Sequence, residues 1–275
     1  MSRNNILLAS VNKEGQGLEV GPSHRPAAPK REGYKVEVID HLDREGLLAK
    51  YRDHNLDLDA IEEVDYIWSG QSYAELTGKT DHYDWIIASH VIEHTPDLVG
   101  FLKQCDSVLK DDGVVSLAVP DKRYCFDYHR PISGLSKVID HHVNEVSINS
   151  PGTVAEYFLN VVKKDGQGAW SESVEGDCDF IHTLEQAADG MKKAWQHKAY
   201  IDCHVWCFVP HSFRLLIQDL NSLGLIAFRE VSFTQTQGSE FFVTLGRQGA
   251  GMDISRIEAA KQIELELARP LLEAA

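Results

Sequence analysis

The 275-residue sequence predicts an α/β protein built around a largely parallel β-sheet. Short apolar segments alternate with helical or loop segments throughout residues 1–120, which is the pattern of repeated β/α units. Two of these segments, 84–89 and 113–120, are continuously apolar or small, as in strands that are covered on both faces. A chain of 30.8 kDa in which 43% of the residues are hydrophobic is long enough to bury such a sheet.

The strands predicted in the first half follow an amino-terminal helix and cover residues 18–20, 34–40, 64–68, 84–89 and 113–120. Between the last two strands, apolar residues from Leu98 to Leu109 recur at helical spacing, and Gly113 is expected to end that helix. This helix is the crossover that parallel neighbours require.

The second half is predicted as a helical insertion followed by a return to the sheet. The insertion contains two amphipathic segments, 150–162 and 183–195, each beginning with a candidate N-cap residue. A helix over 210–225 and two strands over 226–233 and 241–247 follow, and the strands form an antiparallel hairpin.

These patterns divide the chain into three parts. Residues 1–130 and 204–250 form the sheet domain, 131–203 form an inserted cap or substrate region, and 251–275 form a C-terminal helix. That helix could cover the core or a second subunit of a homo-oligomer, and the sequence favours neither.

Charge and composition limit the partners. The net charge of −15 disfavours a nucleic-acid partner, because binding a polyanion needs clustered Lys and Arg. The sequence has no long apolar run and no signal peptide, so we expect no membrane partner and a cytoplasmic location. Five scattered cysteines agree with a reducing compartment.

The loop after the first strand begins like a nucleotide-binding turn, in the stretch GLEVGPSHRP at 17–26. Pro22, Pro26 and Pro29 forbid a regular helix after it, so the ligand is not expected to be held by a helix dipole. Asp40 ends the next strand, twenty-one residues after Glu19. This is about the spacing at which a carboxylate meets a ribose hydroxyl in doubly wound sheets.

Together with residues 83–94, 101–121 and 209–247, these features make the chain resemble the class I S-adenosylmethionine-dependent methyltransferases that act on small molecules. The resemblance covers residues 17–125 and 204–247. It implies a Rossmann-like sheet of seven strands, mostly parallel and with an antiparallel last strand. It also implies S-adenosylmethionine as the cofactor and S-adenosylhomocysteine as the product.

The resemblance also implies the site residues. The methionine part of the cofactor would lie near Glu19, Gly21 and Ser23 in the first loop, and the ribose near Asp40 at the end of the second strand. The adenine would lie near Gln71 after the third strand. The cofactor and the acceptor would meet near Ser89 and His90 at the end of the fourth strand.

Methyl transfer to a protonated acceptor needs a base, and histidine is the natural choice. The candidates are His90, His94, His129 and His204, of which we predict His90 and His204 as catalytic. Asp121 and Arg123 follow the fifth strand, where we expect them to orient a polar acceptor.

The predicted function is methylation of a small polar molecule or a glycan unit, on oxygen, inside a site that the cap encloses. The alternative is a non-catalytic methyltransferase-like domain that binds a ligand as an accessory subunit, because the first loop is altered. An NAD-dependent dehydrogenase is disfavoured because G-x-G-x-x-G is absent.

The sequence predicts no metal site. HVIEH at 90–94 matches the H-x-x-E-H pattern of inverted zinc peptidases, but the buried strand that leads up to His90 keeps the two histidines off a common helix. We therefore disfavour a zinc hydrolase. Cys203, His204 and Cys207 lack a second ligand pair, and we interpret the segment as packed.

Overall fold

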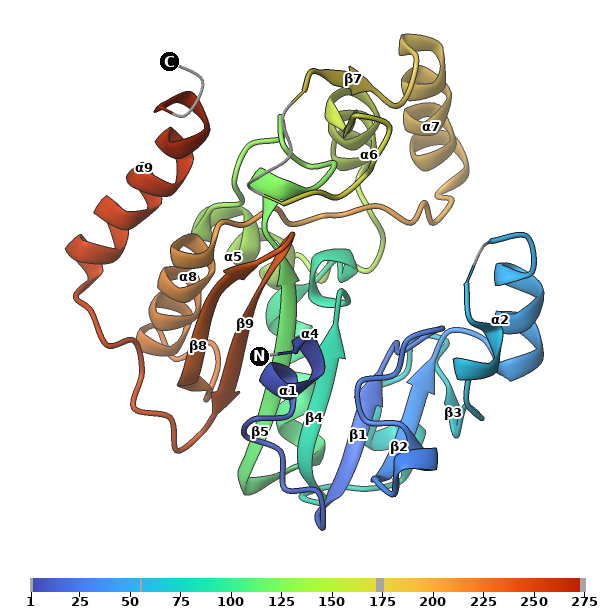
Figure 1. Cartoon of the computed structure of the whole chain (residues 1–275), viewed down its shortest axis with the longest axis vertical. Helices are drawn as coiled ribbons and strands as arrows, with labels where there is room; N and C mark the ends of the chain where they lie inside the picture. Colours follow the sequence, from blue (N-terminus) through green and yellow to red (C-terminus); the bar gives the residue numbers. More distant parts are fainter. Residues whose placement is uncertain (1, 55, 172–175, 273–275) are drawn as a thin grey trace.

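The computed structural model describes residues 2–54, 56–171 and 176–272. Within them, seven strands form one sheet in the order β3-β2-β1-β4-β5-β9-β8 (Figure 1). The strands are β1 Gln16–Val20, β2 Lys35–Asp40, β3 Tyr66–Ile67, β4 Tyr83–Ser89, β5 Leu109–Pro120, β8 Arg229–Gln237 and β9 Glu240–Gly246. The first five run parallel to one another, whereas β9 is antiparallel to both β5 and β8. The predicted sheet, with its antiparallel last strand, is confirmed.

The central strands are buried on both faces, as their continuous apolar runs predict. In β4, Ile86 and Ala88 pack into the core on one face, and Trp85 and Ile87 pack into the core on the other. Successive residues of a strand point to opposite faces, so an uninterrupted apolar run serves both cores.

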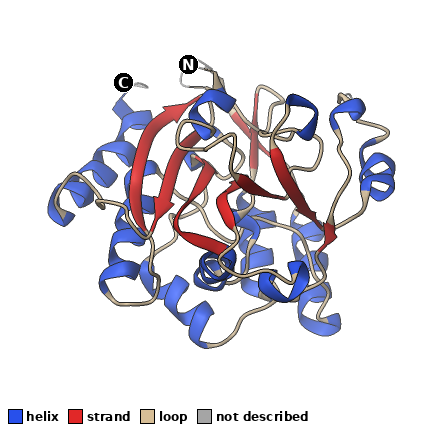
Figure 2. Ribbon diagram, turned by 90° about the horizontal axis from the view of Figure 1, so that it is seen from below, coloured by secondary structure: helices blue, strands red, loops and turns tan. Residues whose placement is uncertain are grey.

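The two faces are covered unequally. The helices α4 Leu98–Val108 and α8 Pro210–Ser222 pack on the larger core cluster. The short helix α1 Arg3–Leu7 and the irregular loop after β1 cover the opposite face, where Ala27 and Ala28 are buried. Figure 2 shows several helices on one side of the sheet and the short helix beside the N-terminus on the other. The prolines of the loop account for the missing helix.

The sequence missed or misplaced several local boundaries. Helix α4 ends at Val108 because Leu109 is already extended, so Gly113 lies inside β5 and does not end the helix. The helices α2 Arg44–Tyr51 and α3 Tyr73–Thr77 were not predicted. Side-chain N-caps start both of them, from Asp43 and from Ser72.

Residues 131–203 contain more than two helices. The elements are α5 Leu135–Val143, α6 Pro151–Asn160, β6 Val162–Lys164, β7 Cys178–Phe180 and α7 Leu184–His197, with β6 and β7 paired in a separate sheet. Helices α6 and α7 share a small core of their own, at the top of Figure 1. Helix α5 instead places Val138 in the main core. The division into domains stays a prediction.

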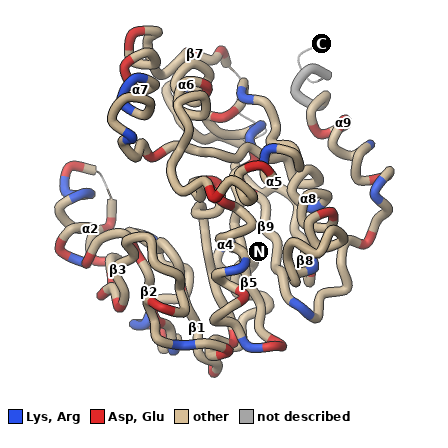
Figure 3. Tube along the Cα trace, turned by 180° about the vertical axis from the view of Figure 1, so that it is seen from behind, with Lys and Arg blue, Asp and Glu red and all other residues tan. Residues whose placement is uncertain are grey.

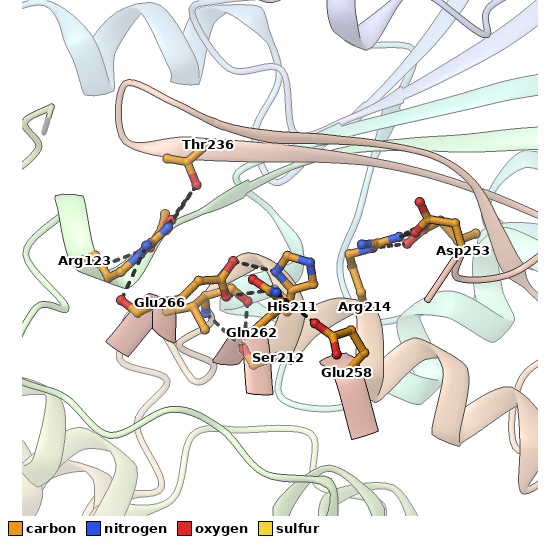
Figure 4. Close-up of polar contacts among 12 residues, drawn as sticks. Arg123, His211, Ser212, Arg214, Thr236, Asp253, Glu258, Gln262 and Glu266 are labelled. Carbon is orange, nitrogen blue, oxygen red and sulfur yellow. Dashed lines mark hydrogen bonds and ion pairs between the residues drawn. The ribbon is translucent and has the colours of Figure 1, made fainter. Parts of the chain in front are cut away.

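The helix α9 Arg256–Leu272 lies against α8 of the same chain. Figure 4 shows the contact, in which Glu266 accepts hydrogen bonds from the backbone N and from Nδ1 of His211, at 3.1 and 2.6 Å. Beside it, Arg123 and Asp121 form a buried ion pair at 2.5 Å. Arg123 also donates to the backbone carbonyl of Glu266 in α9 at 3.4 Å, and Asp121 accepts a hydrogen bond from the hydroxyl of Thr236 in β8 at 2.5 Å. The role in orienting an acceptor that we expected for Asp121 and Arg123 stays a prediction.

Charged residues of both signs are interspersed along the trace in Figure 3. Among the described helices, none combines the length and apolar character needed to cross a membrane.

Candidate active site

The candidate site lies where the parallel strands β1, β2 and β4 end. Their last residues are Val20, Asp40 and Ser89. Because parallel strands have their carboxyl ends at the same edge of a sheet, the three following loops meet there, which is the expected ligand position in an open α/β sheet.

Glu19 closes the first loop onto its strand. Its carboxylate oxygens accept hydrogen bonds from the backbone N of Ala27 and of Ala28, at 2.6 and 3.2 Å. Burial raises the pKa of Glu19 to about 7, although the two backbone hydrogen bonds act in the opposite direction. Glu19 therefore shapes the loop, and its contact with the methionine part of the cofactor stays a prediction.

The first loop keeps the backbone of a glycine turn without a second glycine. Gly21 has a φ of 63°, and Ser23 has a φ of 53°. Residues other than glycine rarely adopt such a positive φ. A hydrogen bond from Ser23 Oγ to the hydroxyl of Tyr51, 2.7 Å long, holds Ser23 in place. Gly21-Pro22-Ser23 therefore forms a tight turn of the glycine type directly after β1.

Asp40 joins the first loop to the second strand. Its Oδ2 accepts a hydrogen bond from Ser23 N at 3.0 Å, and its Oδ1 accepts one from His41 N at 2.7 Å and contacts His41 Nδ1 at 2.5 Å. A carboxylate oxygen can accept two hydrogen bonds. Among the described residues, Oδ2 therefore retains one acceptor position, which fits a ribose hydroxyl.

Gln71 lies in the loop after β3, next to the end of β2. Its Oε1 accepts hydrogen bonds from the backbone N and the hydroxyl of Ser69, at 2.8 and 3.1 Å. Trp68 links the loop to β2 by donating from its backbone N to the carbonyl of Asp40 at 2.8 Å. The predicted adenine side of the site is therefore adjacent to Asp40.

His90 follows β4 with a φ of 54° and lies between two carboxylates. Its Nε2 is 2.8 Å from Glu240 Oε2, and its Nδ1 is 3.4 Å from Glu93 Oε1. Burial alone would lower the pKa of His90, but the two carboxylates outweigh it and raise the pKa to about 9. Arg3 completes the group by donating to the hydroxyl of Ser89 and pairing with Glu240.

His204 approaches the same carboxylate, Glu93, from another part of the chain. Its Nδ1 is 2.5 Å from Asp127 Oδ2, and its Nε2 is 3.9 Å from Glu93 Oε1. Burial would raise the pKa of Asp127, but His204 and then Arg130 outweigh it and lower the pKa to about 2. The structure thus brings together the two histidines that we predicted as catalytic.

Several residues at this point carry no local sequence signal. Asp127 and Asp202 come from loops, and Arg3 comes from the first helix. Glu93 could have been found, because it lies inside the HVIEH motif. His90 and His94 share no α-helix, as predicted, since only the short 3₁₀ helix Ile92–His94 follows β4. Cys203 and Cys207 are buried, which agrees with a packed segment.

The strand order, the glycine-type turn after β1 and the carboxylate that ends β2 agree with the resemblance of the sequence to the class I S-adenosylmethionine-dependent methyltransferases. A family model described as a methyltransferase domain matches residues 3–221, and the chain belongs to that family. The enzyme is therefore a methyltransferase. A comparison with curated proteins found no match.

Solved structures give a looser similarity. An S-adenosylmethionine-dependent methyltransferase from Mesorhizobium loti is 12% identical, covering 87% of this chain and 94% of its own, with a TM-score of 0.41. One from Methanosarcina mazei is also 12% identical, covering 87% and 95%, with a TM-score of 0.40. A structure titled as a putative Zn-dependent alcohol dehydrogenase from Rhodobacter sphaeroides is 13% identical, covering 89% and 88%, with a TM-score of 0.45. These scores are low, and the family assignment rests on the family model.

Proposed function

We propose that the enzyme transfers the methyl group of S-adenosylmethionine to an oxygen atom of a small polar molecule or a glycan unit. One observation carries the proposal: ionisable side chains from three separate segments gather at the carboxyl end of β4. His90 and Glu93 follow that strand, Asp127 follows β5, and Asp202 and His204 lead back from the predicted cap. These side chains pair with one another, and they offer a polar acceptor hydrogen-bonding partners that an apolar acceptor cannot use.

The proposal gives each part of the site a role. The first loop and Asp40 hold the cofactor, Gln71 lies at its adenine, and Ser89 and His90 lie where cofactor and acceptor meet. His204 acts on the acceptor through Nε2, because Asp127 occupies its Nδ1. Residues 131–203 close over the acceptor and exclude water. Transfer from a sulfonium is an in-line displacement, so most of the acceleration comes from alignment of the two reactants.

Charge and thiol chemistry support the rest of the proposal. The net charge of −15 favours a small or neutral acceptor over nucleic acid. All five cysteines are free thiols, which supports a cytoplasmic location.

The test is a methyl-transfer assay on matched acceptors. S-adenosylhomocysteine formation is measured with panels of phenols and sugars, and with amines of similar size. We expect turnover with at least one hydroxyl acceptor and loss of that turnover in His204→Asn. Turnover restricted to amines would contradict O-methylation. If no acceptor is turned over while S-adenosylhomocysteine still binds, the predicted acceptor class is wrong.

A further inference from the structure

Glu93 has an unusual environment for a buried carboxylate. The residue has no exposed surface, and neither carboxylate oxygen accepts a hydrogen bond from the described residues. A buried carboxylate without hydrogen bonds is costly, because the charged form has lost its water. Its nearest charged neighbour is His90, at 3.4 Å. Because neither oxygen is committed to such a hydrogen bond, the carboxylate can bind an ion in competition with the His90 side chain.

Two histidines face this carboxylate. One ligand atom each from Glu93, His94 and His204 lies within 4.8 Å of the other two. The rings of His94 and His204 meet edge to face, with their centroids 4.6 Å apart. Three side chains from two distant segments therefore converge on one point.

Both imidazoles are held in the orientation typical of metal ligands. His204 Nδ1 lies 2.5 Å from Asp127 Oδ2, and His94 Nδ1 lies 2.8 Å from Asp202 Oδ1. This leaves Nε2 of each ring as the remaining nitrogen. In metal sites a ligating histidine almost always donates its second N–H to a carboxylate, a carbonyl or water, which fixes the ring and its tautomer.

We propose that Glu93, His94 and His204 bind a divalent transition-metal ion such as Zn²⁺, Mn²⁺ or Fe²⁺. Two imidazoles and one carboxylate suit these ions, whereas Mg²⁺ and Ca²⁺ prefer all-oxygen sites. Ligands at about 2.0–2.2 Å from one ion lie closer together than the three atoms do here, so the cluster must contract on binding. The His94 side chain is 34% exposed, compared with 6% for His204, and is the one that can rotate inward.

Three protein ligands leave a coordination position open, as in catalytic metal sites. Resting on the proposed function, we place the acceptor oxygen at this open position, so that His204 Nε2 acts on the acceptor by holding the ion and not as a base. A bound ion would lower the pKa of the acceptor hydroxyl, whose proton would leave to solvent before the methyl group is transferred. Binding of the ion itself does not depend on the acceptor.

The experiment is a titration of Zn²⁺ alone, and separately of Co²⁺ alone, into the chelator-treated full chain without a histidine tag. Calorimetry gives the stoichiometry, and the visible spectrum of bound Co²⁺ reports its ligands. We expect one ion per chain, with a Kd of about 10 μM or tighter. We expect affinity to fall about 100-fold or more in His94→Ala and Glu93→Gln, and about 10-fold in Asp202→Asn.

His142→Ala is the matched control. His142 also pairs with a carboxylate, Asp97 at 2.9 Å, but its second nitrogen lies 3.0 Å from Lys103 Nζ, and it is not a member of the cluster. This variant should bind the ion as the wild type does. Because about a third of the His94 side chain is exposed, its variant should fold, which far-ultraviolet circular dichroism checks.

Two results would overturn the metal site: no ion bound at submillimolar concentration, or an equal loss of affinity in His94→Ala and His142→Ala. S-adenosylhomocysteine is titrated into the same samples. If it binds while no ion does, the metal site is wrong and the methyltransferase proposal stands. If the ion binds and no hydroxyl acceptor is turned over, the proposed acceptor is wrong and the metal site stands.

Discussion

Asp40→Ala should weaken cofactor binding by about 10- to 150-fold. The magnitude follows from the acceptor position that remains on Oδ2, because a hydrogen bond to a charged group contributes about 1.5–3 kcal/mol and about 1.4 kcal/mol corresponds to a factor of ten. The carboxylate is 3% exposed, so water replaces the lost contact poorly. The assay is calorimetric titration of S-adenosylhomocysteine into the wild type and the variant.

A loop control separates recognition of the ribose from disorder of the first loop. Tyr51→Phe removes the hydroxyl that Ser23 contacts at 2.7 Å and leaves the Asp40 carboxylate intact. We expect its affinity to stay within about threefold of the wild type. Unchanged affinity in Asp40→Ala would refute the placement of the ribose. An equal loss in both variants would show that loop order, and not a carboxylate-ribose contact, governs binding.

Three further predictions concern stability. The pKa of Glu19 is raised from 4.5 to about 7, so the protonated side chain stabilises the fold fully below pH 4.5, and this contribution is lost as the pH rises through 7. The free energy of unfolding of Glu19→Gln, measured by urea denaturation, should therefore rise by about 3 kcal/mol relative to that of the wild type between pH 4.5 and pH 8. A difference between the two proteins that does not depend on pH would contradict this. Arg123→Met leaves the Asp121 carboxylate buried and unpaired, and should lower the free energy of unfolding by about 3–5 kcal/mol; a loss below about 1 kcal/mol would show that the pair is not buried in solution. Gly21→Ala places a Cβ 3.0 Å from Val91 Cγ2 at a φ of 63°, and should cost about 1–2 kcal/mol, measured by thermal unfolding; an unchanged Tm would mean that the loop adopts another conformation.

The sheet could be predicted because its signals are local. The apolar run of β4 and the helical spacing of α4 are each readable within about twelve residues. The helices α2 and α3 are only eight and five residues long, which is too short to show a helical periodicity, and the signals that start them are single capping residues. The packing of α5 against the main core depends on tertiary contacts, and the sequence of α5 alone does not indicate it.

The residues that we predict at the cofactor could be chosen from the sequence, since parallel topology places the ends of β1 and β2 together, and their contact with the cofactor stays a prediction. On the acceptor side, the sequence indicated His90 and His204 but not the residues that pair with them. The contact between Asp127 and His204 spans 77 residues, and that between Arg3 and Glu240 spans 237. Neither aspartate nor arginine stands in a motif, so only the folded chain brings them together.

The position of β9 between β5 and β8 affects how the chain can be made. Pro120 of β5 pairs with Glu240 of β9, so about 120 residues must leave the ribosome before the edge of β5 has a partner. At roughly 5–20 residues per second, the wait is about 6–24 s. During that time a long apolar strand presents unpaired backbone groups to other nascent chains. The yield of native enzyme should therefore depend on how quickly translation delivers the final hairpin.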